Sequence, residues 1–99
     1  MYKLRYLNQA RDDLLHIKSY LTRQSGSSAV ALKFTSKLRQ QCRKLASYSG
    51  QVGHPRPELG KDIRSFAYGN YLIFFMYKEQ ELRVISITEG HRDLLNLFR

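Results

Sequence analysis

The sequence is poor in the residues that cross-link or ligate. It has one cysteine, two prolines and no tryptophan in 99 residues. Cys42 has no partner for an intramolecular disulfide, and its place in a helical pattern favours a small buried residue over a reactive thiol. One cysteine and three scattered histidines provide no cluster of zinc ligands. We therefore expect neither a metal site nor a cofactor.

A long uncharged apolar stretch is also missing. Nothing approaches the roughly 20 apolar residues that span a bilayer, and Arg5 and Arg11 interrupt the start before a signal-peptide core can form. We expect a cytoplasmic protein with no membrane partner. With 42% apolar residues, the chain is long enough for one compact domain, residues 1–99, and too short for a second.

Acidic residues are scarce. Seventeen Lys and Arg stand against eight Asp and Glu, so the formal net charge is +9. Such a chain attracts polyanions: nucleic acid, a ribosome, an acidic protein segment or an anionic membrane surface would each fit. Charge alone does not choose among them.

The first half of the sequence predicts a strand and two helices. Residues 2–7 alternate in polarity and lead into a helix capped by Asn8, and a second helix, capped by Ser27 or Ser28, extends to about Ser47. Because the loop between the helices is short, they should form an antiparallel hairpin. Each helix has an apolar stripe, made of Ala10, Leu14, Ile17 and Leu21 in the first and of Val30, Phe34, Leu38, Cys42 and Leu45 in the second.

The second half predicts a small, mainly antiparallel sheet. Residues 48–60 contain three glycines and both prolines, which is typical of an ordered crossing loop. Residues 62–68, 71–78 and 82–89 are rich in aromatic and β-branched residues and predict a three-stranded meander. Residues 91–98 predict a short closing helix, so the fold class is α+β.

The stretch "IRSFAYGNYLIFFMY", residues 63–77, predicts a hairpin with two unlike faces. Gly69 and Asn70 suit a two-residue turn that pairs Tyr68 with Tyr71. Alternation then defines an arginine face, made of Arg64, Phe66, Tyr68, Tyr71, Ile73, Phe75 and Tyr77. The opposite face has Ile63, Ser65, Ala67, Leu72, Phe74 and Met76.

We expect the helix hairpin to cover the opposite face, where small residues face large aliphatic ones, and the arginine face to stay open as a partner surface. An ordinary outer face, partly sheltered by the crossing loop, is the alternative. If Glu79 and Gln80 form the last turn, Ile85 and Ile87 join the helix-covered face. Leu82, Val84, Ser86 and Thr88 then join the arginine face, and a slip of one residue would exchange these sets.

Several motifs occur in a characteristic order: Ala10, Asp13, Leu14, Ile17, Tyr20 and Leu21 in the first helix, then "PRPELG", "IRSF", "GNYLIFF" and "GHRDL". In this the chain resembles ParE-type toxins of the RelE/ParE superfamily, the toxin half of bacterial toxin-antitoxin pairs. The resemblance implies an α+β domain silenced by an antitoxin whose disordered segment folds on binding, giving a hetero-oligomer. ParE-type members stall the cleaved-DNA complex of DNA gyrase, whereas RelE-type members cut messenger RNA, usually on the ribosome.

Three residues fit the nuclease alternative. By resemblance Arg64 would stabilise the phosphorane, Glu58 would act as base, and His91 would match a C-terminal catalytic histidine. Yet His91 is followed by Arg92 and Asp93, as in ParE-type members, and no tyrosine or histidine comes after it. Glu58 also suits a loop-anchoring carboxylate that pairs with a nearby Arg or Lys. We therefore expect gyrase inhibition by binding, with no catalytic residue.

The expected binding residues fall into two sets. Arginine offers a planar fork and tyrosine offers contact area at small entropic cost, so the target should bind at Arg56, Lys61, Arg64, Tyr68, Tyr71, His91 and Arg92. The antitoxin should lie along the helix hairpin or add a strand to a sheet edge, and its expected contacts are Leu14, Ile17, Leu21, Phe34 and Leu38. A non-toxic nucleic-acid-binding domain is a third alternative.

Overall fold

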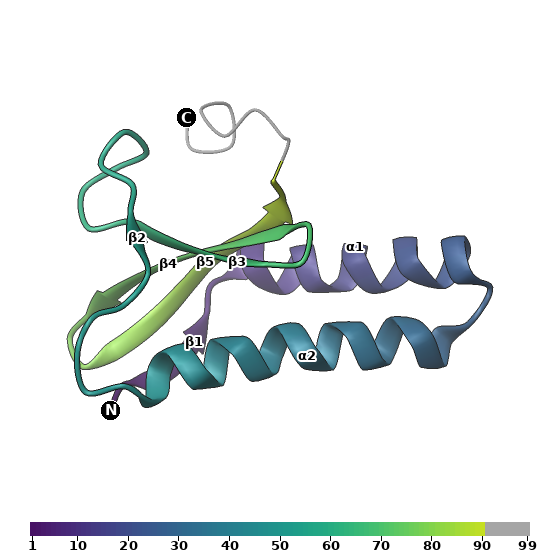
Figure 1. Cartoon of the computed structure of the whole chain (residues 1–99), viewed down its shortest axis with the longest axis horizontal. Helices are drawn as coiled ribbons and strands as arrows, with labels where there is room; N and C mark the ends of the chain where they lie inside the picture. The colour runs from purple at the N-terminus through teal and green to yellow at the C-terminus, as the bar shows by residue number, and fades with distance from the viewer. Residues whose placement is uncertain (91–99) are drawn as a thin grey trace.

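The computed structural model describes residues 1–90, which form two helices on one side of a five-stranded sheet (Figure 1). The strand order is β1-β5-β4-β3-β2, with β1 parallel to β5 and the other pairs antiparallel. This is the predicted α+β architecture, while the predicted closing helix, residues 91–98, lies outside the described residues. The elements are β1 (Lys3–Tyr6), α1 (Asn8–Ser25), α2 (Ser28–Ser47), β2 (His54–Pro55), β3 (Arg64–Tyr68), β4 (Tyr71–Lys78) and β5 (Glu81–Glu89).

The helix ends follow local signals. The hydroxyl of Ser27 accepts a hydrogen bond from the N–H of Val30 at 3.2 Å and caps α2 as predicted. At α1 the predicted cap is wrong, because Asn8 is the first helical residue and Leu7 before it makes no side-chain cap. Gly26 ends α1 at φ 71°, a left-handed conformation that favours glycine, and turns the chain back into α2. Neither helix is long and apolar enough to cross a membrane.

Both predicted hairpin turns are confirmed. Tyr68 pairs with Tyr71 across Gly69, which has φ 58°. Glu79 and Gln80 have φ values of 52° and 66°, as a two-residue type I′ turn requires, and place Lys78 opposite Glu81. The alternation of side chains along β3 and β4 is therefore as the sequence predicts.

The prediction that the arginine face is open is wrong, because the helices cover that face. Val30, expected to point inward, is 53% exposed, and Ala31 is fully buried in its place. The ring of Phe34 on α2 lies 5.5 Å from that of Tyr71. The strand residues of the arginine face that share one core with both helices are Tyr71, Ile73, Phe75 and Tyr77, with Phe66 and Tyr68 packed at its margin.

The physical reason is apolar area. The four large side chains of Tyr71, Ile73, Phe75 and Tyr77 offer more apolar surface for burial than the opposite face, where Ser65, Ala67 and Ser86 are small or polar beside Leu72, Phe74 and Met76. Tyrosine hydroxyls do not prevent this burial when they find partners. The hydroxyl of Tyr77 donates to the carbonyl of Leu45 at 3.3 Å and accepts from the N–H of Val52 at 3.2 Å.

A β-bulge changes the face of β5 midway. The pairing shifts between Phe74 and Phe75, so that Val84 faces Phe75 while Ser86 faces Phe74. Leu82 and Val84 lie on the arginine face as predicted. After the bulge, Ile87 lies on the arginine face with Leu82 and Val84, in the core that the helices cover, and not on the opposite face as predicted. The reason is that one extra residue in β5 reverses the alternation of side chains.

Candidate functional site

The crossing loop is tied to β3 through Arg56. Its Nε donates to Ser65 Oγ at 2.9 Å and its Nη1 donates to Glu58 Oε2 at 3.4 Å. The predicted pairing of Glu58 with a nearby cation is therefore confirmed. Glu58 remains 52% exposed at its side chain, so this ion pair contributes little stability by itself and mainly orients the loop.

Arg64 holds the same loop from the other side. Its Nη1 donates to the carbonyl of Gly53 at 3.2 Å, and the arginine is half-buried. Gly53 has φ 95°, and a Cβ at this position would lie 2.5 Å from Cζ of Phe75. Arg64 thus fixes a glycine that passes directly against the core, which is a structural role for its guanidinium.

The predicted target residues differ in accessibility. Lys61 is exposed, while Arg56, Arg64 and Tyr68 are half-buried and Tyr71 is only 9% exposed. Two further members of that set, His91 and Arg92, lie outside the described residues. Of the three candidate nuclease residues, Glu58 accepts a hydrogen bond from Arg56, and Arg64 donates one to the carbonyl of Gly53. The third, His91, lies outside the described residues.

The predicted antitoxin residues belong mostly to the core. Leu14, Ile17 and Leu38 are 2%, 7% and 0% exposed and pack against the sheet. Leu21 and Phe34 are half-buried and line a shallow depression near the Gly69–Asn70 turn. A partner on the hairpin would therefore meet the margin of this apolar stripe rather than its centre.

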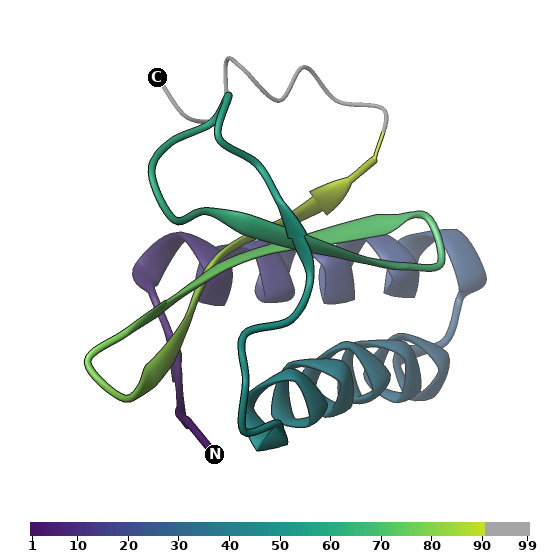
Figure 2. The same cartoon turned by 60° about the vertical axis from the view of Figure 1, so that its left-hand side comes forward.

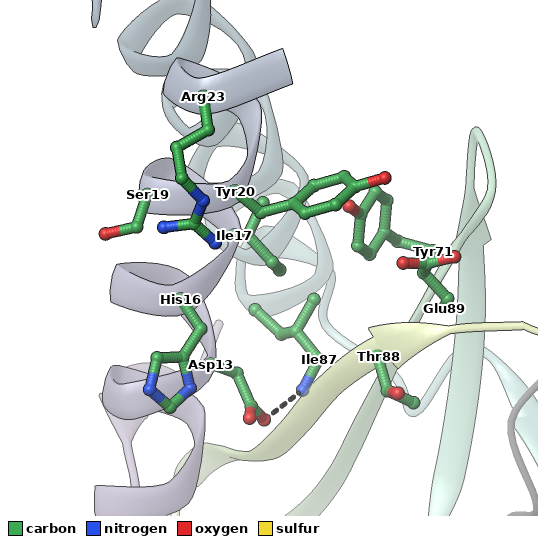
Figure 3. Close-up of a pocket in the computed structure, with 10 residues that line it drawn as sticks. All are labelled: Asp13, His16, Ile17, Ser19, Tyr20, Arg23, Tyr71, Ile87, Thr88 and Glu89. Carbon is green, nitrogen blue, oxygen red and sulfur yellow. Dashed lines mark hydrogen bonds between the residues drawn. The ribbon is translucent and has the colours of Figure 1, made fainter.

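A groove that the sequence analysis missed lies between α1 and the second half of β5 (Figure 3). It exists because β1 pairs with β5 only from Glu81 to Val84, so that α1 flanks the rest of this strand. Its volume is about 470 Å³. The lining residues are Asp13, His16, Ile17, Ser19, Tyr20, Arg23, Tyr71, Ile87, Thr88 and Glu89.

Asp13 closes the β5 edge inside this groove. Its Oδ2 accepts hydrogen bonds from the N–H of Ile87 at 2.9 Å and from the hydroxyl of Ser86 at 2.8 Å. Its Oδ1 accepts from Nε2 of Gln9 at 2.8 Å. A carboxylate that satisfies a strand N–H blunts that edge, because an added strand would have to displace it.

The groove combines an apolar floor with a charged rim. Ile17, Ile87 and Tyr71 are buried beneath it, whereas Tyr20 is 44% exposed and extends from α1 toward Tyr71 (Figure 3). Arg23 makes no ion pair with any residue of the described range 1–90. Such a site suits a segment with an apolar anchor and an acidic neighbour.

A sequence signal for the groove exists. Asp13, His16, Tyr20 and Arg23 recur at three and four residues, which places them in a second stripe beside the apolar one. Pattern alone does not separate such a stripe from a solvated face. The groove needs the later segment Ile87–Glu89 as its second wall, and the bulge in β5 sets where that wall lies.

Cys42 is buried, as predicted, beneath α2. Burial raises the pKa of its thiol to about 11, with smaller opposing effects from the nearby Tyr6 hydroxyl and from Arg39. Burial also raises the pKa of the Tyr6 phenol. The Arg39 guanidinium lies 5.3 Å from the centre of the Tyr6 ring. A protonated, enclosed thiol is not a nucleophile, so this cluster is structural.

Comparison with known proteins identifies the family. Residues 4–94 match the family described as ParE toxin of type II toxin-antitoxin system, parDE. A solved structure of a chromosomal ParDE TA system from P. aeruginosa has a similar fold, with a TM-score of 0.77, 22% identity, and coverage of 90% of this chain and 96% of that chain. Among curated proteins no relative matches significantly. The chain belongs to the ParE toxin family of type II toxin-antitoxin systems.

Proposed function

We propose that this toxin arrests growth by binding DNA gyrase and stalling its cleaved-DNA complex, without itself making or breaking a bond. The observation that carries the proposal is the match of residues 4–94 to ParE toxins. The engagement of Glu58 and Arg64 in loop contacts supports it, because a general base and a phosphorane cation need freedom to meet substrate. This action requires a cytoplasmic toxin.

The target surface we propose is the cationic end of the sheet beside the crossing loop. Lys61 is exposed there, and Arg56 and Arg64 present their accessible parts, whereas Tyr68 lies at the other end of β3, beside the Gly69–Asn70 turn. Tyr71 pairs with Tyr68 at that turn and is 9% exposed, so both tyrosines lie apart from this surface. His91 and Arg92 remain predictions from the sequence alone.

The antitoxin partner, we propose, places a helical segment over the groove between α1 and β5. Strand addition is disfavoured at one point on each side of the sheet. Asp13 occupies the N–H of Ile87 at one edge, and at the other β2 has two residues, of which Pro55 has no N–H. A segment with an apolar anchor near Tyr20 and a carboxylate near Arg23 would fit the groove, while Leu21 and Phe34 could extend the contact.

One paired experiment tests the gyrase proposal. Purified protein is added to gyrase with supercoiled plasmid and, in parallel, to translating ribosomes with a reporter message. We expect loss of supercoiling with accumulation of cleaved DNA, while the message stays intact. Messages cut at codon positions, with gyrase unaffected, would replace the proposal by ribosome-dependent cleavage of messenger RNA. Loss of neither activity would favour a non-toxic binding domain.

A further inference from the structure

The cations of this protein are unevenly distributed. No Asp or Glu occurs from residue 14 to residue 57, although this segment contains most of both helices. α2 alone has five cations and no acidic residue. They are Lys33, Lys37, Arg39, Arg43 and Lys44.

All five cations are exposed, with Arg39 and Arg43 on the flank of α2 toward Tyr6. Seven positions from 33 to 44 are exposed, and the two that are not cations are Ser36 and Gln40. At 3.6 residues per turn, Lys33, Lys37 and Lys44 fall within about 40° of the helix circumference. We call these three residues the lysine stripe. No other described element lies on the side of α2 that faces away from α1 and the sheet (Figures 1 and 2).

Structural roles account for only part of this set of cations. A cation in the last turn complements the helix dipole, which explains Lys44, and Arg39 packs over the ring of Tyr6. Lys33 and Lys37 repel each other at a spacing of four residues, and so do Arg39 and Arg43. Within residues 1–90 none of the five forms a salt bridge. This repulsion would be relieved by a partner with closely spaced negative charges.

We propose that the outer face of α2 binds the phosphate backbone of double-helical DNA. A peptide partner would need apolar anchors, and the exposed positions between Lys33 and Lys44 include none, while the exposed Val30 and Leu32 lie nearer the start of α2. Single-stranded nucleic acid is bound largely by base stacking, and these positions include no aromatic ring either. A straight cationic helix instead matches the regular phosphates of a duplex, without reading sequence.

The proposal goes beyond gyrase inhibition. Binding of this surface to duplex phosphates does not require that gyrase is the target. The choice of DNA over RNA as the duplex rests on the proposed gyrase function. In a cleaved-DNA complex this surface would let the toxin contact the DNA beside the enzyme. The three phosphate contacts of the lysine stripe contribute about −3 to the slope of the logarithm of the binding constant against the logarithm of salt concentration.

The test is fluorescence anisotropy with a labelled DNA duplex of mixed sequence, titrated with the whole protein at several salt concentrations and without gyrase. Three variants are compared with the unaltered chain. K33Q/K37Q/K44Q removes the lysine stripe, and K33R/K37R/K44R keeps its charge. R11Q/K18Q/K78Q removes three exposed charges from α1 and the β4–β5 hairpin as a matched control. Thermal melting of each variant verifies folding.

We expect the glutamine stripe variant to lose at least tenfold in affinity at low salt and about three units of salt slope. The arginine variant should bind as the unaltered chain does, and the control should lose distinctly less. Equal losses in the stripe and control variants would overturn the proposal in favour of diffuse attraction. Tighter binding of double-stranded RNA or single-stranded DNA than of the duplex would also overturn it, as would failure to bind DNA at low salt.

Discussion

The two helices of the hairpin share an inner chemistry and differ on their outer sides. α1 has 18 residues and α2 has 20, and each buries an apolar stripe in the same core. The flank of α1 has Asp13, Tyr20 and Arg23 and forms a groove with β5. The exposed positions of α2 from Lys33 to Lys44 are five cations with Ser36 and Gln40, and the helix has no acidic residue. The same inner packing thus leaves two different outer surfaces. The groove beside α1 suits a peptide, and the cationic side of α2 suits a phosphate backbone.

This separation is physically simple. Inner positions are constrained by packing, because a buried side chain cannot change volume without leaving a cavity or a clash. Outer positions of a helix contribute little to folding and are free to differ. Variants that exchange or erase the outer differences should therefore alter binding, and variants of the inner stripe should alter stability alone.

The largest effect should come from the inner stripe. Leu38→Ala empties a fully buried site on α2 and should lower the free energy of unfolding by about 2–5 kcal/mol. Leu32→Ala on the same helix is the matched control, since Leu32 is 54% exposed and its loss should cost less than about 0.5 kcal/mol. Urea unfolding measures both, and equal costs would show that the inner and outer sides are misassigned.

The next effect concerns the carboxylate on the groove side of α1. Asp13→Ala leaves the N–H of Ile87 without its acceptor and should destabilise the protein by about 1–3 kcal/mol. Hydrogen exchange at the Ile87 amide should speed up more than exchange at neighbouring amides. Asp12→Ala, at the adjacent exposed position, should change neither. An unchanged Ile87 amide would mean that α1 does not close this edge.

The groove itself should respond through the antitoxin. Tyr20→Ala combined with Arg23→Glu removes an aromatic contact and reverses the rim charge, so affinity for the cognate antitoxin should fall at least tenfold, or about 1.4 kcal/mol. Calorimetric titration measures the loss. Lys18→Glu, an exposed α1 residue that does not line the groove, serves as control. A larger loss in the control would place the antitoxin elsewhere on the hairpin.

The smallest effect should come from the inner side of α2 at alkaline pH. The folded pKa of Cys42 is raised to about 11, so the unfolded chain releases this proton first. The stability that this thiol contributes is complete below the unfolded pKa of about 8.5 and is lost as pH rises toward 11. Between pH 7 and 9 the free energy of unfolding should fall by less than about 1 kcal/mol.

Urea unfolding at several pH values, compared with Cys42→Ala, measures that loss, which should be weaker in the variant. Alkylation of the thiol should need unfolding. Rapid alkylation of the folded protein at pH 8 would contradict a dry inner side.

Much of the fold follows from local signals in the sequence. The Gly69–Asn70 pair fixes the partner of Tyr68, and the spacing of apolar residues gives both helices. Alternation shows that a strand has two faces, but it does not show which face the helices cover. That choice depends on the total apolar area each face can bury, and the face with Tyr71, Ile73, Phe75 and Tyr77 outweighs the face with Ser65, Ala67 and Ser86.

The candidate site was less predictable for a related reason. The bulge in β5, where the pairing shifts between Phe74 and Phe75, has no local signal such as a glycine, yet it decides which face of the sheet Ile87 joins. The groove joins this shifted segment to Asp13, more than seventy positions earlier. The role of Arg64 could not be predicted for a similar reason. Its hydrogen-bond acceptor is a backbone carbonyl of the crossing loop, and because every residue has such a carbonyl, the sequence does not show which one Arg64 contacts.

The most direct test of two separate surfaces is a gyrase cleavage assay with and without the cognate antitoxin, run on the groove variant Y20A/R23E and the stripe variant K33Q/K37Q/K44Q. The groove variant should still trap cleaved DNA and should resist neutralisation by the antitoxin. The stripe variant should trap less cleaved DNA and should be neutralised normally. If both variants change the same readout, the two helices present a single shared surface and the account is contradicted.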